Sequence, residues 1–142
     1  MASNPVFLDS NGWVALLNTR DPLHAQASAL LRELGRTGRP IVRTDWIVAE
    51  TGNGLARTPA RTKLREAVAR FQRSPQFRIV SVSQDPMERA LKLYSERADK
   101  TWGLVDCASF TVMSDAGNFD TFTTDRHFEQ AGFTCLLPAS AS

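Results

Sequence analysis

Short apolar runs alternate along the chain with longer segments in which apolar residues recur at spacings of three and four. The short runs are rich in β-branched and aromatic residues, and they predict strands at 5–9, 40–44, 77–82, 119–125 and 133–137. The longer segments predict helices at 11–18, 21–35, 45–56, about 60–73, 83–98, 103–116 and 126–132. Strands that alternate with helices through short connections indicate an α/β fold, with a parallel sheet covered by helices on both faces.

Several predicted helices begin or end at residues that favour helix boundaries. Asp21 is expected to cap the helix that follows it, and Gly35 is expected at the end of that helix. Asp45 is expected to cap the next helix, and Ser83 or Asp85 the one that starts near residue 83.

Composition indicates one globular domain over residues 1–142, with an ordered core at about 5–137 and a disordered tail at 138–142. The chain of 142 residues is 42% apolar and 23% charged. No apolar run reaches the roughly 18 residues that span a membrane. The first residues lack the pattern of a secretory signal. Neither Cys107 nor Cys135 has the spacing of a zinc site, so we expect a protein of the reducing cytoplasm.

The positive charge is concentrated in one segment, residues 57–78. The chain carries a net charge of +2, whereas this segment has seven basic residues and one acid, so it carries +6 and the remainder −4. The basic residues are Arg57, Arg61, Lys63, Arg65, Arg70, Arg73 and Arg78. A polyanionic partner such as RNA is one interpretation, and a solvated helix face is the other.

Four carboxylates stand beside apolar sequence. Asp9 and Asp125 each follow a predicted strand, which places them at the carboxyl edge of the sheet, where α/β proteins bind ligands. Asp106 lies among apolar residues in "GLVDCASF", in the first turn of a predicted helix. Glu50 shares a helix face with apolar residues three and four positions before it. Buried carboxylates are normally protonated, paired or bound to a metal.

Clustered carboxylates without cysteine or histidine ligands favour a hard cation, Mg²⁺ or Mn²⁺, which can promote displacement at phosphorus. Each acid also has an ordinary interpretation. Asp9 and Asp125 are possible helix caps, and Glu50 is a possible exposed helix residue. Asp106 is a possible capping-box residue, although Gly103 has no side chain to complete such a box. If the acids cluster, we expect their charges to raise the pKa of Asp106.

The segments "FLDSNGWVALLN", "DWIVAETGN", "GLVDCASF" and "TFTTDRHFEQAGF" together resemble the PIN-domain ribonucleases, particularly the VapC-type toxins of prokaryotic toxin–antitoxin systems. The order and approximate spacing of the four acidic motifs match that family from about residue 5 to 137. Many relatives carry Ser or Thr at the position of Gly103, which is a departure from the pattern.

This resemblance implies a three-layer α/β/α sandwich around a parallel sheet of four or five strands. It implies an endoribonuclease that depends on Mg²⁺ or Mn²⁺, with catalytic and metal-binding residues Asp9, Glu50, Asp106 and Asp125. Ser10 and Thr124 match small hydroxyl residues that support such a site. RNA is then the substrate, and Arg57, Arg61, Lys63 and Arg65 are candidates for holding its backbone. Members usually form homodimers and are silenced by a small antitoxin that fills the active-site groove.

Two rival functions remain open at this stage. A non-catalytic RNA- or protein-binding module could keep the fold, and a metal-dependent phosphatase could use a similar scaffold. His127 is expected to be an exposed or capping residue rather than a general base. The three tryptophans, Trp13, Trp46 and Trp102, are expected in the core or a groove wall. Other acids near the motifs, Asp99, Asp115 and Asp120, are expected to be solvated.

Overall fold

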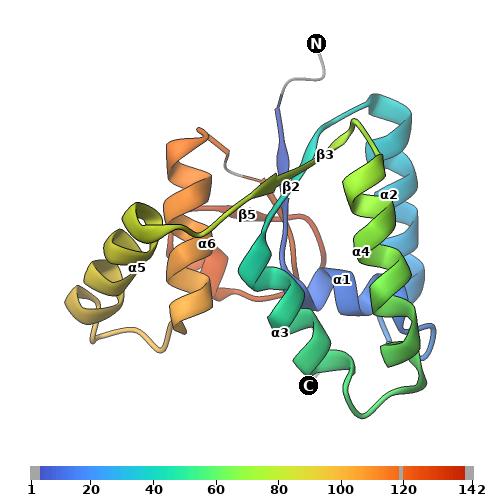
Figure 1. Cartoon of the computed structure of the whole chain (residues 1–142), viewed down its shortest axis with the longest axis horizontal. Coiled ribbons are helices and arrows are strands. Elements are labelled where there is room, and N and C mark those ends of the chain that lie inside the picture. The colour runs from blue at the N-terminus through green and yellow to red at the C-terminus, as the bar shows by residue number, and fades with distance from the viewer. Residues whose placement is uncertain (1–3, 119, 140–142) are drawn as a thin grey trace.

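A five-stranded parallel sheet forms the centre of the protein (Figure 1). The computed structural model describes residues 4–118 and 120–139. The strands are β1 (Val6–Leu8), β2 (Ile41–Thr44), β3 (Phe77–Val80), β4 (Asp120–Phe122) and β5 (Thr134–Cys135). Their order across the sheet is β3-β2-β1-β4-β5, and each neighbouring pair is parallel.

Helices cover both faces of this sheet. They are α1 (Ser10–Leu17), α2 (His24–Thr37), α3 (Asp45–Leu55), α4 (Leu64–Arg73), α5 (Gln84–Glu96), α6 (Leu104–Asp115) and α7 (His127–Gln130), with a short 3-10 helix, η1 (Pro59–Lys63), before α4. Helices α5 and α6 lie on one face, and α1, α2 and α4 lie on the other (Figure 1). The predicted three-layer α/β/α sandwich is confirmed. No helix in residues 4–118 and 120–139 is long and apolar enough to cross a membrane.

Aromatic side chains fill the space between the sheet and each helical layer. On the α6 side, the ring of Phe128 lies 6.4 Å from that of Phe7 and 4.9 Å from that of Phe110. On the other side, the rings of Trp13 and Phe71 are 5.7 Å apart. Because both faces of β1 are buried, its sequence is a continuous apolar run without polar alternation.

Gly12 allows α1 to lie directly against the end of β4. A Cβ atom at this position would stand 2.2 Å from the carbonyl oxygen of Phe122, so a larger residue cannot occupy it without movement of the backbone. This close approach brings the first residues of α1 beside the segment that follows β4. The candidate site is built at this junction.

The boundaries of α2 differ from those predicted. Asp21 does not cap the helix; its carboxylate accepts a hydrogen bond from the backbone N–H of Leu23 at 2.9 Å, within a turn that precedes the helix start at His24. The helix also continues through Gly35. Gly38, with φ of 68°, takes the left-handed position that ends it. The helix therefore ends three residues later than predicted, at the glycine whose backbone is left-handed.

The predicted cap of α3 is also wrong. Asp45 is the first residue of that helix and Thr44 occupies the cap position. The Asp45 carboxylate instead accepts the backbone N–H of Val82 at 2.8 Å, which ties α3 to the segment after β3. Ser83 occupies the predicted cap position of α5. The predicted basic helix at 60–73 is divided, since its first turn is η1 and only the remainder is α4.

Two predicted segments extend beyond the described residues. The strand predicted at 119–125 forms over Asp120–Phe122, and Phe119 lies outside the described residues. Of the tail predicted to be disordered, residues 140–142 also lie outside the described residues.

Candidate metal centre

The structure brings the four predicted carboxylates to the carboxyl edge of the sheet. Asp9 directly follows β1, and Asp125 lies just beyond the end of β4, the neighbouring parallel strand. Glu50 reaches the same edge from α3, and Asp106 from the first turn of α6. The negative charges of Asp106 and Glu50 both raise the pKa of Asp9, and that of Asp125 raises the pKa of Glu50 and of Asp106.

Asp9 is the most buried of the four, with 2% of its surface exposed. Its Oδ2 atom lies 2.8 Å from the hydroxyl oxygen of Thr123. Its Oδ1 atom is buried and has no hydrogen-bond partner in the described residues. Burial raises the pKa of Asp9 to about 7, although the Thr123 hydrogen bond partly opposes this shift. An ionised Asp9 therefore needs a positive partner at Oδ1.

Glu50 is positioned by the first residue of α1. The Ser10 hydroxyl donates a hydrogen bond of 2.5 Å to Oε1 of Glu50. Burial is the largest cause that raises the pKa of Glu50, and the charges of Asp106 and Asp125 add to it. The contact joins α1 to α3 and orients the carboxylate toward the other acids.

Asp106 caps α6, contrary to the argument that Gly103 disfavours a capping role. The Asp106 Oδ2 atom accepts the backbone N–H of Gly103 at 3.0 Å, and this half of a capping box requires no side chain at Gly103. Burial is the main cause that raises the pKa of Asp106, ahead of the charge of Asp125. The expected direction of the pKa shift is correct, but its main cause is desolvation. Asp106 thus caps the helix and also faces the acidic cluster.

His127 belongs to the site and is not an exposed residue. Its side chain is 29% exposed, and Nδ1 lies 3.4 Å from Oδ2 of Asp106 and 3.4 Å from Oδ1 of Asp125. The Asp125 carboxylate also accepts the backbone N–H of His127 at 2.9 Å, so it supports the start of α7 as well. One ligand atom from each of these three residues lies within 4.8 Å of the others. The one sequence feature that could have indicated His127 as a site residue is its position two residues after Asp125.

This set of side chains fits a divalent cation. Within residues 4–118 and 120–139, no Lys or Arg forms an ion pair with any of the four carboxylates. Close carboxylates without a cation repel one another and resist ionisation. The oxygen-rich donor set is the one that Mg²⁺ and Mn²⁺ prefer. The buried Oδ1 atom of Asp9, which accepts no hydrogen bond from the described residues, can serve such an ion as a ligand.

Thr123 and Asn11, which the sequence did not single out, link the acids at the end of β4. The Thr123 hydroxyl oxygen lies 2.8 Å from Asp9 Oδ2 and 2.7 Å from Asn11 Oδ1, and it accepts the backbone N–H of Asp125. A hydroxyl has one proton, so it donates to one of the two oxygens at a time. Thr124, the predicted supporting residue, donates its backbone N–H to Asn11 Oδ1 at 3.1 Å. Its side chain lines a cavity next to the acids.

A basic cluster follows α3, the helix that carries Glu50. Its members are Arg57, Arg61, Lys63 and Arg65. All four are exposed, and none forms an ion pair in the described part of the chain. Some of the basic residues that follow do pair with an acid, because Glu66 binds Arg70 and Arg73. The uncompensated charge therefore lies in the segment between α3 and the first residues of α4 rather than along all of α4.

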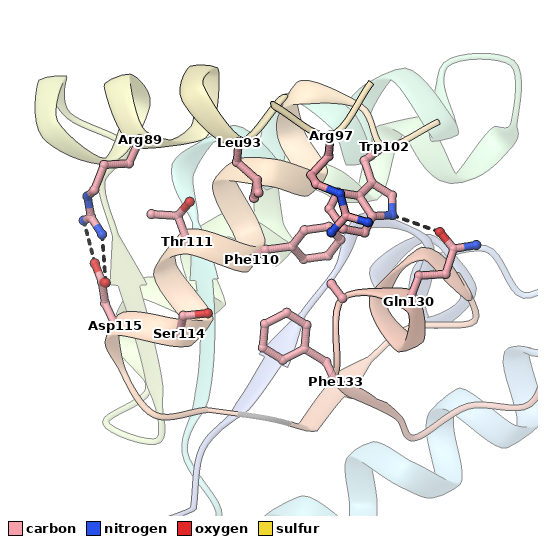
Figure 2. Close-up of a pocket in the computed structure, with 11 residues that line it drawn as sticks. Arg89, Leu93, Arg97, Trp102, Phe110, Thr111, Ser114, Asp115, Gln130 and Phe133 are labelled. Atoms are coloured by element: carbon pink, nitrogen blue, oxygen red, sulfur yellow. Dashed lines mark hydrogen bonds and ion pairs between the residues drawn. The ribbon is translucent and has the colours of Figure 1, made fainter. Parts of the chain in front are cut away.

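The other acids near the motifs pair with arginines and stay outside the carboxylate cluster. The pairs are Asp115–Arg89, Asp99–Arg97 and Asp120–Arg39, at 2.6, 2.9 and 2.7 Å. Figure 2 shows the first of them at one end of a cavity of about 410 Å³ between α5 and α6. Trp102 forms part of that wall, as predicted, and the Arg97 guanidinium lies over its ring. Asp99 and Asp115 are exposed and Asp120 is half-buried, and each is paired with an arginine, which refines the expectation that they are solvated.

Comparison with known proteins gives one family and several relatives. The family model described as "PIN domain" matches residues 6–134. The 23S rRNA-specific endonuclease VapC20 of Mycobacterium tuberculosis is 28% identical over 134 residues, which covers 94% of this chain and 98% of VapC20. The crystal structure of VapC20, described as a sarcin-ricin loop cleaving toxin, matches with a TM-score of 0.77 at 26% identity, covering 91% of this chain and 96% of that one.

A more distant structure shares the fold alone. VapBC2 from Rickettsia felis, solved bound to a DNA fragment from its promoter, matches with a TM-score of 0.66 at 14% identity. The match covers 92% of this chain and 96% of that one.

Proposed function

We propose that this chain, which belongs to the PIN-domain family, is a Mg²⁺- or Mn²⁺-dependent endoribonuclease. We further propose that it is the toxin of a toxin–antitoxin pair. The observation that carries this proposal is the convergence of Asp9, Glu50, Asp106 and Asp125 on one edge of the sheet, without a neutralising Lys or Arg in the described residues. The RNA that such toxins cut is cytoplasmic, so we place the protein in that compartment.

The residues of the site have different roles in the proposed reaction. The carboxylates hold the cation, and a bound Mg²⁺ or Mn²⁺ supplies the acidity that activates water and stabilises charge at phosphorus. Ser10 and Thr123 orient two of the carboxylates through hydrogen bonds. The basic cluster binds the phosphate backbone near the cut, because its four charges have no acidic partner in the described residues.

Ribosomal RNA is the first substrate to test. VapC20 is named as specific for 23S rRNA and as cleaving the sarcin-ricin loop, and it matches this chain along almost its whole length. We therefore propose a structured ribosomal RNA loop as the substrate class. If the substrate is not ribosomal RNA, cleavage of total RNA will identify the RNA that is cut.

The test is cleavage of a sarcin-ricin loop RNA and of total RNA by the purified protein with Mg²⁺, with Mn²⁺ or with EDTA. Cleavage should require the cation. Asp9→Asn and Asp106→Asn should each lower the rate on the order of a thousandfold, since removing a ligand weakens an interaction of several kcal/mol. Asp115→Asn, the same chemical change outside the cluster, should cleave like the wild type.

Four outcomes contradict the proposal. Equal cleavage in EDTA, or full activity in both ligand variants, would exclude the metal centre. RNA binding without cleavage under either cation would favour a non-catalytic module. Faster turnover of a small phosphate ester than of any RNA would favour a phosphatase.

We place the antitoxin in an apolar groove of about 620 Å³ between α1, α2 and α4. Its apolar lining comes from Trp13, Leu16, Leu17, Leu31 and Ala67, and its charged rim from Arg32, Lys63, Arg70 and Glu66. Three cations against one acid favour an amphipathic segment with acidic residues. Leu31→Glu should abolish binding of the cognate antitoxin while leaving RNA cleavage intact. Ala29→Glu, on the exposed side of the same helix, should change neither.

We place a homodimer interface on α5 and the edge strand β3. The exposed apolar side chains there are Met87, Leu91, Tyr94 and Ile79, at 36%, 41%, 51% and 41% exposure. In a dimer with twofold symmetry, this apolar patch of one copy contacts the same patch of the other copy. Glu88 and Lys92 on α5 have opposite charges, which antiparallel copies of the helix can pair. Leu91→Glu should therefore be monomeric by light scattering. A dimeric Leu91→Glu variant would contradict this assignment.

A further inference from the structure

We infer that the cavity between α1 and α3 binds one nucleobase of the RNA beside the cleaved bond, with Asn53 reading the base edge and Asn11 orienting the nucleotide. This inference rests on the proposed ribonuclease function and extends it to substrate selection.

The cavity is continuous with the carboxylate centre. It has a volume of about 410 Å³, within the roughly 300–1,000 Å³ range of small-ligand sites. Ser10, Glu50 and Thr124 line the end next to the acids. The remaining lining residues are Asn11, Val14, Ala15, Asp21, Leu23, Asn53 and Gly54. Six of these ten lining residues are polar or charged and the others are small or apolar, a mixture that suits a flat, hydrogen-bonding ring.

Gly54 keeps the wall of this cavity thin. A Cβ atom there would lie 3.0 Å from Cγ2 of Val14, so a side chain would crowd the α1–α3 contact. The helices can approach closely without a side chain from residue 54 between them. The space beside this contact stays open for a ligand.

Asn11 presents a fixed donor to the cavity. The backbone N–H of Thr124 can only donate, so the Asn11 atom 3.1 Å from it is the carbonyl Oδ1. The Thr123 hydroxyl lies 2.7 Å from the same oxygen, and both contacts hold the amide in one orientation. The Nδ2 group has no partner in the described residues. Its two protons are therefore available to an oxygen or ring nitrogen of the nucleotide.

Asn53 supplies the selective group. It lies three residues after Glu50 on α3, so both side chains project from the same helix face. Its side-chain amide has no hydrogen-bond partner in the described part of the chain, and the residue is exposed. A free asparagine amide can donate and accept at once, a pattern that matches the N6 and N7 atoms of adenine.

The charge of the cavity favours a base over a phosphate. Its ionisable lining residues are Asp21 and Glu50, and no Lys or Arg is among the described residues that line it. A phosphate would be repelled, whereas the N–H groups of a base would be attracted. The phosphates instead have the basic cluster outside the cavity.

The experiment compares cleavage positions in an RNA library with a randomised loop. The wild type should prefer adenine at one position beside the cut. Asn53→Ala should lose this preference and cleave preferred sequences about ten- to one-hundredfold more slowly, the loss expected for one bidentate base contact. Arg57→Ala should instead slow all sequences equally, because phosphate contacts carry no sequence information.

A binding measurement separates recognition from catalysis. In EDTA, adenosine 5′-monophosphate should shift the side-chain amide resonances of Asn11 and Asn53 in the NMR spectrum of the wild type. In the Asn53→Ala variant the Asn11 resonances should still shift, but by less than in the wild type. Shifts confined to another surface would overturn the assignment of the cavity.

The possible outcomes distinguish this inference from the proposed function. A wild type that cleaves no RNA contradicts the ribonuclease function itself. A wild type that cleaves, with a base preference that Asn53→Ala retains, contradicts the nucleobase subsite alone. If Asn53→Ala keeps the cleavage pattern but weakens antitoxin binding, the cavity receives an antitoxin side chain and the inference is wrong.

Discussion

Replacing Asp9 with Asn should stabilise the metal-free protein above neutral pH. Burial raises the pKa of Asp9 from 3.8 to about 7, so between these values the folded protein holds a proton that the unfolded chain has lost. Stability therefore falls as the pH rises from about 4 to about 7 and then levels off. The full loss is about 4 kcal/mol at about 1.36 kcal/mol per pKa unit, of which about 2 kcal/mol falls between pH 5 and pH 7. Asparagine carries no charge to desolvate and lacks this loss.

The assay is urea unfolding in EDTA, followed by circular dichroism, at pH 5 and pH 8. Asp9→Asn should exceed the wild type by several kcal/mol at pH 8 and by much less at pH 5. A smaller decline should persist in the variant, because burial also raises the pKa of Glu50 and Asp106. Asp115→Asn, which removes an exposed ion pair, should not gain stability at pH 8.

Two results would refute this reasoning. One is a wild type that is as stable at pH 8 as at pH 5 without metal. The other is an Asp9→Asn variant with the same pH dependence as the wild type. As a further check, Mg²⁺ should stabilise the wild type more at pH 8 than at pH 5, because protons no longer compete for the carboxylates. Asp9→Asn should respond less to Mg²⁺.

Three other predictions concern packing and charge. Gly12→Ala should lower the free energy of unfolding by about 2–4 kcal/mol, because its Cβ would overlap the carbonyl oxygen of Phe122; this is measurable by urea titration. Gly35→Ala, where a Cβ meets nothing within 4 Å, should raise the same free energy by about 0.5–1 kcal/mol, and destabilisation would contradict the open surroundings. RNA affinity should fall with salt concentration, and Arg57→Ala should reduce that log–log slope by about one if Arg57 contacts phosphate; an unchanged slope removes it from the interface.

The elements of the fold were readable because each has a local cause. The alternation of apolar runs with helical patterns identified every strand and α-helix that the structure describes, although not the separate 3-10 helix η1, and the PIN resemblance agrees with the family match over residues 6–134. The errors lie at boundaries. Asp21 and Asp45 are both sound cap residues by type, yet neither occupies a cap position. Asp21 accepts the N–H of Leu23 within a local turn, whereas Asp45 accepts the N–H of Val82, which is distant in sequence. Local propensity cannot include the tertiary partner of Asp45.

The site was readable only in part. The carboxylates could be predicted because the carboxyl ends of parallel strands and the starts of the following helices meet at one edge. The residues that support the carboxylates could not be predicted from the sequence. Thr123 and Thr124 are adjacent residues of the same type, and only the path of the chain after β4 turns the Thr123 hydroxyl toward Asp9. His127 and Asn11 likewise became site residues through distances that no spacing rule supplies.

The sequence by itself determined which elements form, that they build a parallel sheet, and which acids reach its carboxyl edge. Periodicity and residue type are local properties, and they are sufficient for the elements and for Asp9 and Asp125, whereas the assignment of Glu50 and Asp106 rested on the PIN-domain resemblance. The tertiary structure alone decided how strongly those acids are perturbed, since the raised pKa of Asp9 depends mainly on burial by residues distant in sequence. It also decided that Asp106 caps a helix while facing the cluster, and that Asn11 and Asn53 border one cavity. These properties arise from packing between α1, α3, α6 and the sheet, which no single segment encodes.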